Sequence, residues 1–325
     1  MRIFVTGASG FIGSAVVRDL LEGGHEVAGL VRSKEAAERL EAAGTRAVRG
    51  SVENTDLLRR EAAAADAVIH TAFYHKFSHA SLKMKLKIML GGSPARTPAR
   101  FMAAAVETEL RAIEAFGAVL SGRSGALVIA MPTMTLTPGR LAAEDDRGDA
   151  SSIGGGRVAS ENALLALAGS GVRASLVRLP PIVYGTGDRG GLLPSLIRSA
   201  RFKDAAAYIG QGANRWPAVH RLDAARLFKL AAEQAPAGSR LHAVGEEGVP
   251  FRHIAEAIAR QANLPSKQIH KEEAGSYFGW LGPFVATDNP VSSTLTRELY
   301  GWSPVERDLM AEMEHGDYFA GPSPR

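Results

Sequence analysis

The chain has 325 residues, of which 46% are hydrophobic and 22% charged, a balance typical of a globular protein and not of a disordered one. No apolar run approaches the roughly 18 residues of a membrane span, and the start resembles a strand, so we expect neither a transmembrane helix nor a signal peptide. The absence of cysteine excludes disulfides, thiolate catalysis and zinc–sulfur sites, and fits a cytoplasmic protein. The net charge of +4 leaves an anionic partner open until the charge is located.

Short apolar strands alternate with helical patterns through the first half of the chain. The pattern predicts strands at residues 2–5, 25–31, 46–49, 67–70, 126–130 and 174–179, with helices at 11–21, 34–43, 55–64, 101–120 and 157–168. This alternation predicts an α/β fold, a Rossmann-type doubly wound parallel sheet over residues 1–185. Residues 186–325 are less regular and predict a smaller mixed C-terminal substrate lobe, interleaved with the core.

A glycine-rich turn follows the first predicted strand. Gly7, Gly10 and Gly13 join that strand to a helix, with spacing that permits a tight turn, a close backbone approach and close helix packing. The helix N-terminus then offers N–H groups and a positive dipole end to a diphosphate. We therefore predict a dinucleotide site, to which the intervening residues also contribute, namely Ser9, Phe11 and Ile12.

The end of the second predicted strand favours NADP over NAD. An acidic residue there would bind the ribose 2′-hydroxyl of NAD, but Arg32 and Ser33 occupy this place. Arg32 can pair with a 2′-phosphate, and Ser33 can donate a hydrogen bond to it.

Several motifs in sequence order resemble those of the short-chain dehydrogenase/reductase superfamily, of the extended or atypical type related to NAD-dependent epimerase/dehydratases. They are TGASGFIG at 6–13, DAVIHTA at 66–72, VRLPPIVYG at 177–185, VHRLDAA at 219–225 and LYGWSP at 299–304. The resemblance implies further cofactor contacts. Ser51 and Val52 would bracket the adenine, Thr71 and Ala72 would line the ribose side, and Pro180 would line the nicotinamide.

The catalytic residues of that family are only partly matched. The family uses a Tyr and a Lys four residues apart, and the matching positions hold Ile153 and Arg157. Ile153 cannot transfer a proton, whereas Arg157 could still hold a ribose or an anion. Thr133 is the hydroxyl nearest to the family's Ser/Thr position.

Another group must therefore supply a proton if the chain reduces a carbonyl. Tyr184 and His75 are the candidates carried forward, since His is a general acid at neutral pH. Tyr74, His79, His220 and water stay open, and each of these side chains has a structural role as its alternative. No metal site is predicted.

The basic excess is concentrated in one insertion. Residues 75–100 hold six Lys and Arg and no acid, and removing these six charges from +4 leaves −2 for the rest of the chain. Apolar residues alternate with lysines from Leu82 to Ile88, which predicts an exposed strand or hairpin arm. This arm is either a lid that recruits an anionic or amphipathic substrate or a solvated insertion.

The sequence thus predicts an NADP-dependent oxidoreductase, a reductase acting on a carbonyl or similar group of a small molecule, with NADP(H) as cofactor. A nucleotide-sugar epimerase/dehydratase and a non-catalytic NADP-binding regulatory protein are the alternatives. We expect neither nucleic acid nor a membrane as a partner. Extended relatives often dimerise through two long helices, here 101–120 and 157–168, but alanines there are equally typical of ordinary helices.

Overall fold

The structure is a computed structural model that describes residues 1–75 and 77–320. The chain forms two compact units, each assembled from several segments. The first unit comprises Met1–Met131, Gly156–Val177 and Phe228–Arg240, and the second comprises Pro132–Gly155, Arg178–Leu227 and Leu241–Arg325. The chain therefore crosses between units at more points than a single boundary near residue 185 implies.

A seven-stranded sheet with the order β10-β6-β5-β4-β1-β2-β3 organises the first unit. β1 pairs in parallel with β2 and β4, β2 with β3, and β4 with β5. The strands are β1 (Arg2–Thr6), β2 (Glu26–Val31), β3 (Arg46–Arg49), β4 (Ala67–His70), β5 (Ala126–Pro132), β6 (Arg173–Leu179) and β10 (Ser239–His242). This confirms the predicted doubly wound α/β fold, whose parallel strands end at a common edge.

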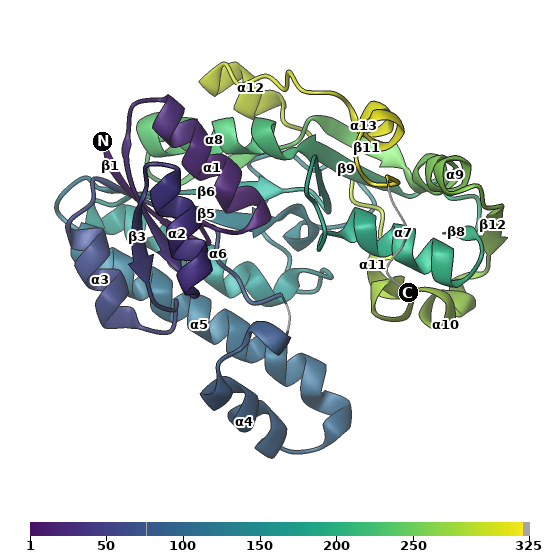
Figure 1. The fold of residues 1–325 in the computed structure, drawn as a ribbon, viewed down its shortest axis with the longest axis horizontal. Coiled ribbons are helices and arrows are strands. Elements are labelled where there is room, and N and C mark those ends of the chain that lie inside the picture. The colour runs from purple at the N-terminus through teal and green to yellow at the C-terminus, as the bar shows by residue number, and fades with distance from the viewer. Residues whose placement is uncertain (76, 321–325) are drawn as a thin grey trace. The chain divides into compact units, whose positions relative to one another are not determined.

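Helices cover both faces of this sheet (Figure 1). On one face α3 (Thr55–Ala63), α5 (Thr97–Leu120) and α6 (Val158–Ala166) bury an apolar core against the strands. The other face carries α1 (Phe11–Glu22) and α2 (Lys34–Ala42), together with the second half of α8 (Arg221–Gln234). An ion pair between Lys229 and Asp19 joins α8 to α1, and a hydrogen bond between Glu233 and His25 joins α8 to the loop that follows α1.

Two small sheets and a separate core form the second unit. β9 (Arg215–His220) pairs in parallel with β7 (Ile182–Tyr184) and antiparallel with β11 (Glu246–Pro250), while β8 (Ala206–Ile209) pairs in parallel with β12 (Ser266–Ile269). The helices are α7 (Leu192–Phe202), α9 (Phe251–Ala262), α10 (Ala274–Phe278), α11 (Gly282–Val285), α12 (Thr294–Tyr300) and α13 (Leu309–His315). The aromatic residues Tyr208, Trp216 and Phe278 are buried in this core.

The basic insertion is helical, so the predicted exposed strand is wrong. Residues Leu82–Leu90 form α4, whose first turn is capped by the Ser81 side chain accepting from the backbone N–H of Met84. Met84 and Ile88, four residues apart, pack with Ala104 and Ala105 of α5. The alternation of apolar residues thus belongs to a helix with two apolar sides, only one of which is covered.

Among the helices that the structure describes, none combines the length and the apolar character needed to cross a membrane.

Candidate cofactor and active site

The glycine-rich turn has the close packing that only glycine allows. Gly7 adopts a φ of 72°, and a Cβ added to it would lie 2.7 Å from Thr71 Oγ1. A Cβ on Gly13 would lie 2.1 Å from the carbonyl oxygen of Gly7, closer than any real contact. The Gly10 N–H donates to that same carbonyl at 2.8 Å, which closes the turn. Glycine is therefore required at positions 7 and 13 by the backbone geometry itself.

The N-terminus of α1 differs from those of the two helices that follow. Its N-cap is Gly10, which provides no side-chain cap, and its first turn holds no acidic residue. By contrast, Ser33 caps α2 and Asn54 caps α3, each by accepting a hydrogen bond from the helix backbone. A helix start with a positive dipole end, a glycine at the cap and no carboxylate nearby fits a diphosphate. The residues present thus fit a dinucleotide.

The end of β2 carries exposed positive charge. Arg32 is exposed, and Arg49 of β3 lies in register with Val31, the last residue of β2. The Ser33 oxygen accepts from the Ala36 N–H. The pKa of Glu35 is lowered by hydrogen bonds to its carboxylate from the Glu35 backbone N–H and from the Ser33 hydroxyl. The Ser33 side chain therefore caps α2, and the second cation near this strand end is Arg49, which sequence reasoning missed.

A hydrogen-bonded group follows β3, at the position predicted to bracket the adenine. The Tyr74 hydroxyl donates to Glu53 Oε1 at 3.0 Å and lies 3.3 Å from Ser51 Oγ. Ser51 Oγ also accepts from the Glu53 backbone N–H. Val52 packs beside the cores of the first unit. Glu53 is the carboxylate of this group, and its contact with Tyr74 could not be read from sequence because the two lie 21 positions apart.

The end of β4 brings Thr71 against the glycine turn. Thr71 Oγ1 donates to the carbonyl oxygen of Thr6 at 2.8 Å, and Ala72 follows it. His70 is fully buried with Nδ1 2.6 Å from Thr6 Oγ1, and burial lowers its pKa to about 4. His70 is therefore a neutral side chain within the sheet, as its position in the strand predicts.

Arg157 is held in a buried ion pair. Its Nε donates to Glu109 Oε2 at 3.1 Å, and its terminal nitrogen donates to Glu109 Oε1 and, at 2.8 Å, to the carbonyl oxygen of Ala130. The guanidinium also lies over the Phe73 ring, 4.2 Å from its centroid. These contacts hold Nε and one terminal nitrogen of the guanidinium on groups of the protein itself. The geometry gives Arg157 a structural role, while a catalytic role stays a prediction.

Thr133 follows β5 in the second unit, where it forms part of a fixed buried contact. Its hydroxyl donates to Asn289 Oδ1 at 2.8 Å, and Asn289 Nδ2 donates back to the Thr133 carbonyl at 3.2 Å. Pro180, after β6, is buried as well. Ile153, at the position of the family's tyrosine, is 40% exposed. The residue that the resemblance assigns to the family's catalytic tyrosine therefore carries no hydroxyl of its own.

Tyr184 is engaged inside the second unit. Its hydroxyl donates to the carbonyl oxygen of Arg307 at 2.8 Å and lies 3.2 Å from Glu246 Oε1. Burial raises the pKa of Tyr184 far above the ordinary value of a tyrosine. His220 packs edge-on against it, with ring centroids 5.5 Å apart. These contacts correspond to the structural alternative for Tyr184, because a buried, hydrogen-bonded hydroxyl is a poor proton donor.

His75 is the exposed candidate. It lies after β4 in the first unit, with its ring 5.1 Å from that of Phe73. The side chain of His79 lies outside the described residues, as does Lys76. Among the considered proton donors whose side chains the structure describes, His75 is thus the one that is left accessible. No group of three or more acidic or histidine side chains suited to a metal occurs in the described part of the chain.

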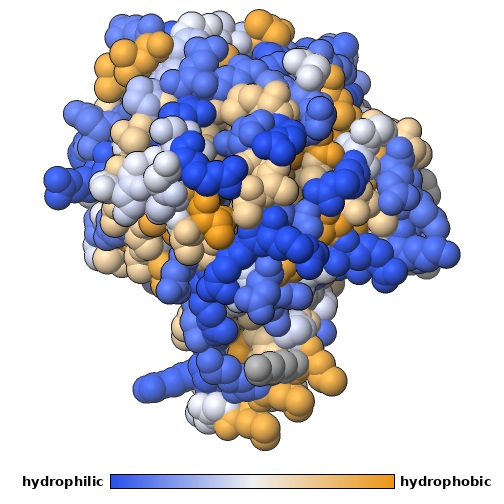
Figure 2. All heavy atoms as spheres, turned by 90° about the vertical axis from the view of Figure 1, so that its left-hand side faces the viewer, coloured by the Kyte–Doolittle hydropathy of each residue, from blue (hydrophilic) through white to orange (hydrophobic). Residues whose placement is uncertain are grey.

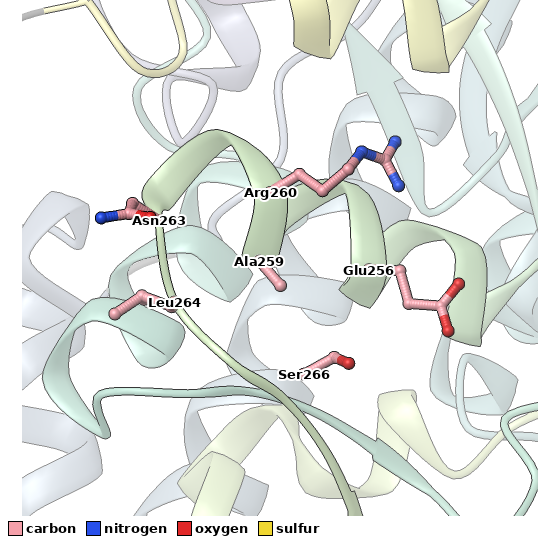
Figure 3. Close-up of a pocket in the computed structure, with 6 residues that line it drawn as sticks. All are labelled: Glu256, Ala259, Arg260, Asn263, Leu264 and Ser266. Atoms are coloured by element: carbon pink, nitrogen blue, oxygen red, sulfur yellow. The ribbon is translucent and has the colours of Figure 1, made fainter.

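A shallow hollow of about 370 Å³ lies on the second unit, between the C-terminal end of α9 and the start of β12 (Figure 3). Its lining residues are Glu256, Ala259, Arg260, Asn263, Leu264 and Ser266. The Glu256 carboxylate already accepts from Arg252 Nε at 2.7 Å. None of these residues is among those assigned to cofactor or catalysis, so this hollow is separate from the candidate site.

Comparison with known proteins supplies the classification. The sequence profile of the NAD dependent epimerase/dehydratase family matches residues 3–244. The chain belongs to this family. Two family relatives are similar over almost their whole length: an uncharacterized protein of Schizosaccharomyces pombe, 44% identical over 98% of this chain and 100% of its own, and one of Saccharomyces cerevisiae, 37% identical over 96% and 98%.

Solved structures place this epimerase/dehydratase family member among similar folds. UDP-glucuronic acid 4-epimerase from Bacillus cereus, in complex with UDP-glucuronic acid and NAD, has a TM-score of 0.72 at 16% identity and covers 98% of this chain and 99% of its own. DesIV, a dTDP-glucose 4,6-dehydratase from Streptomyces venezuelae with NAD bound, has a TM-score of 0.72 at 18% identity and covers 98% and 97%. At such identities the likeness establishes the shared fold.

A further similarity covers a shorter part of the chain. Over 72 residues, 22% of each chain, this family member is 39% identical to a 4-hydroxy-2-methyl-3-oxo-4-farnesyl-3,4-dihydroquinoline-1-oxide ketoreductase of Stigmatella aurantiaca.

Proposed function

We propose that this chain is an NADPH-dependent reductase acting on a carbonyl or similar group of a small molecule. One combination of features carries the proposal. The glycine turn leads into α1, whose N-terminus has no side-chain cap, and the residue directly after β2 is an arginine and not a carboxylate. The NAD-bound structures of similar fold and the ketoreductase similarity support a nicotinamide cofactor and a reduction.

The chain's own residues would divide the binding work between the ends of four strands, β1 to β4. The backbone at Gly10–Gly13 receives the diphosphate, while Arg32 and Arg49 are the cations suited to a 2′-phosphate. Val52 and the Ser51–Tyr74–Glu53 group flank the adenine, and Thr71 lies on the ribose side. When bound, the cofactor supplies a hydride equivalent to an acceptor carbon. His75 or water then supplies the proton to the substrate oxygen.

The arginine pair predicts the cofactor preference. Arg32→Glu would place a negative charge beside the 2′-phosphate and favour a ribose 2′-hydroxyl instead. Losing a charge-assisted hydrogen bond of about 1.5–3 kcal/mol corresponds to about 10- to 100-fold weaker NADPH binding. The measurement is the Kd of NADPH and of NADH by titration calorimetry. The matched control is Arg59→Glu, which reverses one charge on α3, away from the glycine turn. An unchanged NADPH/NADH ratio in Arg32→Glu would refute the phosphate role.

A nucleotide-sugar epimerase/dehydratase is the second candidate, because structures with that activity share the fold. It requires a proton-transferring group at the position that Ile153 occupies, and the neighbouring family lysine is replaced by an arginine that is ion-paired to Glu109.

A binding protein without turnover is the third candidate, and it predicts tight NADPH binding with no substrate reduced.

A further inference from the structure

The outer side of α4 is an exposed apolar face. Leu82, Leu86, Met89 and Leu90 follow the spacing i, i+4, i+7, i+8, which places them along one side of a helix. Their exposed fractions are 73%, 50%, 65% and 83%, respectively. Figure 2 shows apolar side chains gathered at the lower end of the molecule, where the helical hairpin projects in Figure 1. We call these four residues the α4 apolar face.

Positive charge accompanies this face. Lys85 and Lys87 lie on α4 between its members, and Arg96 follows in the turn toward α5. The segment from 75 to 100 contains no acidic residue. Lys87 pairs with Glu107 of α5, yet its side chain is still 67% exposed. A ligand that contacts the α4 apolar face therefore meets a positive surface at the same time.

The hairpin presents this face on a fixed backbone. Arg100 Nε donates to the Ile88 carbonyl at 2.8 Å, and its terminal nitrogens donate to the carbonyls of Ser93 and Gly92 and to Thr97 Oγ1. One guanidinium thus ties the end of α4 to the turn and to the start of α5. The other side of α4 is anchored by Met84 and Ile88. The apolar face is held outward by folded structure and does not result from a loose loop.

We propose that the α4 apolar face docks this protein reversibly on an anionic lipid surface. The apolar side chains would enter the interfacial region while the neighbouring Lys and Arg side chains contact anionic headgroups. A symmetric contact with a second copy would set the same basic side chains against each other, which is unfavourable. A nucleic acid would satisfy the charge but leave four large apolar side chains in water. This proposal departs from the expectation from sequence that a membrane is not a partner, and it is independent of the reductase activity.

Vesicle co-sedimentation of the full chain tests the proposal. We expect binding to vesicles of phosphatidylcholine with phosphatidylserine, weaker binding at higher salt, and little binding to phosphatidylcholine alone. Leu86→Ser with Leu90→Ser should weaken binding about tenfold for each leucine. Lys85→Gln with Lys87→Gln should weaken it about fivefold for each lysine. Far-ultraviolet circular dichroism and a thermal unfolding curve report whether each variant is folded.

Matched variants on the second unit control for general surface effects. Leu299→Ser with Val305→Ser removes two apolar side chains of comparable exposure, and Lys267→Gln with Lys271→Gln removes two exposed lysines. These should bind vesicles like the wild type. The proposal is overturned if the wild type does not bind anionic vesicles, or if the serine pair binds as well as its control. It is also overturned if sedimentation velocity shows that the serine pair instead dissociates a dimer.

Discussion

His242 and His70 illustrate how burial fixes the charge of single residues. His242 Nδ1 donates to the Ser292 carbonyl at 2.7 Å, and its Nε2 accepts from Arg178 at 3.0 Å, which requires a neutral ring. Burial, and then the charge of Arg178, lower the pKa of His242 to about 3. In His70, burial lowers the pKa to about 4, with the Arg157 charge contributing and the Glu109 charge opposing. The pKa of both rings is therefore lower in the folded protein than in the unfolded chain.

This predicts a loss of stability in acid. A histidine with a folded pKa below its unfolded value of 6.5 stabilises the fold fully above pH 6.5, and this stabilisation is lost as the pH falls toward the folded pKa. For His70 the window runs from pH 6.5 to about 4, and the loss is about 3 kcal/mol at most. Urea unfolding of wild type and His70→Gln at several pH values measures it. The glutamine variant should show a shallower pH slope, and exposed His253→Gln should keep the wild-type slope. Equal slopes for wild type and His70→Gln would contradict this account.

At the scale of elements, the Glu109–Arg157 pair connects α5 to the start of α6. Both side chains are almost completely buried, and the second arginine contact, to the Ala130 carbonyl, ties them to β5. The position that the resemblance assigns to a catalytic lysine thus contributes to the assembly of two helices and a strand. Sequence alone could not reveal this ion pair, because Glu109 lies 48 residues from Arg157, in the middle of a helix whose sequence has no unusual feature.

The pair predicts a strong thermodynamic coupling. Glu109→Gln or Arg157→Met alone leaves a buried charge without its partner and should cost about 3–5 kcal/mol of unfolding free energy. The double variant should cost clearly less than the two single changes together, since no charge is then left unpaired. Guanidinium unfolding of the four proteins measures this cycle. Additive losses would mean that the two side chains act independently, contrary to the structure.

The elements were predictable to different degrees. The strands and helices of the first unit follow from the alternation of apolar segments, and the glycine turn follows from its spacing. The insertion was misassigned because Leu82, Met84, Leu86 and Ile88 alternate like a strand, whereas the Ser81 cap and the fit of Met84 and Ile88 against α5 stabilise a helix. The alternating pattern is compatible with a strand and with a helix, and the tertiary packing against α5 selects the helix.

At the scale of the whole molecule, local geometry was predictable from sequence and long-range contacts were not. Glycine spacing and strand ends are local features, so the glycine turn and the places of Arg32 and Thr71 at strand ends could be predicted, while their roles toward a cofactor stay predictions. Contacts such as Tyr184 with Arg307 or Thr133 with Asn289 join residues more than 120 positions apart and are set only by the folded second unit. The structure also shows where the basic excess of the chain lies, which is beside the α4 apolar face.

The central claim is that the chain reduces a substrate with NADPH although the family's tyrosine is replaced by Ile153. The most direct test is NADPH oxidation by the purified protein against a broad panel of ketones, aldehydes and imines, with NADH in parallel. The account predicts turnover of at least one carbonyl compound with NADPH, and weaker turnover of the same compound with NADH. Tight NADPH binding without turnover of any compound in the panel would contradict it and favour a binding protein.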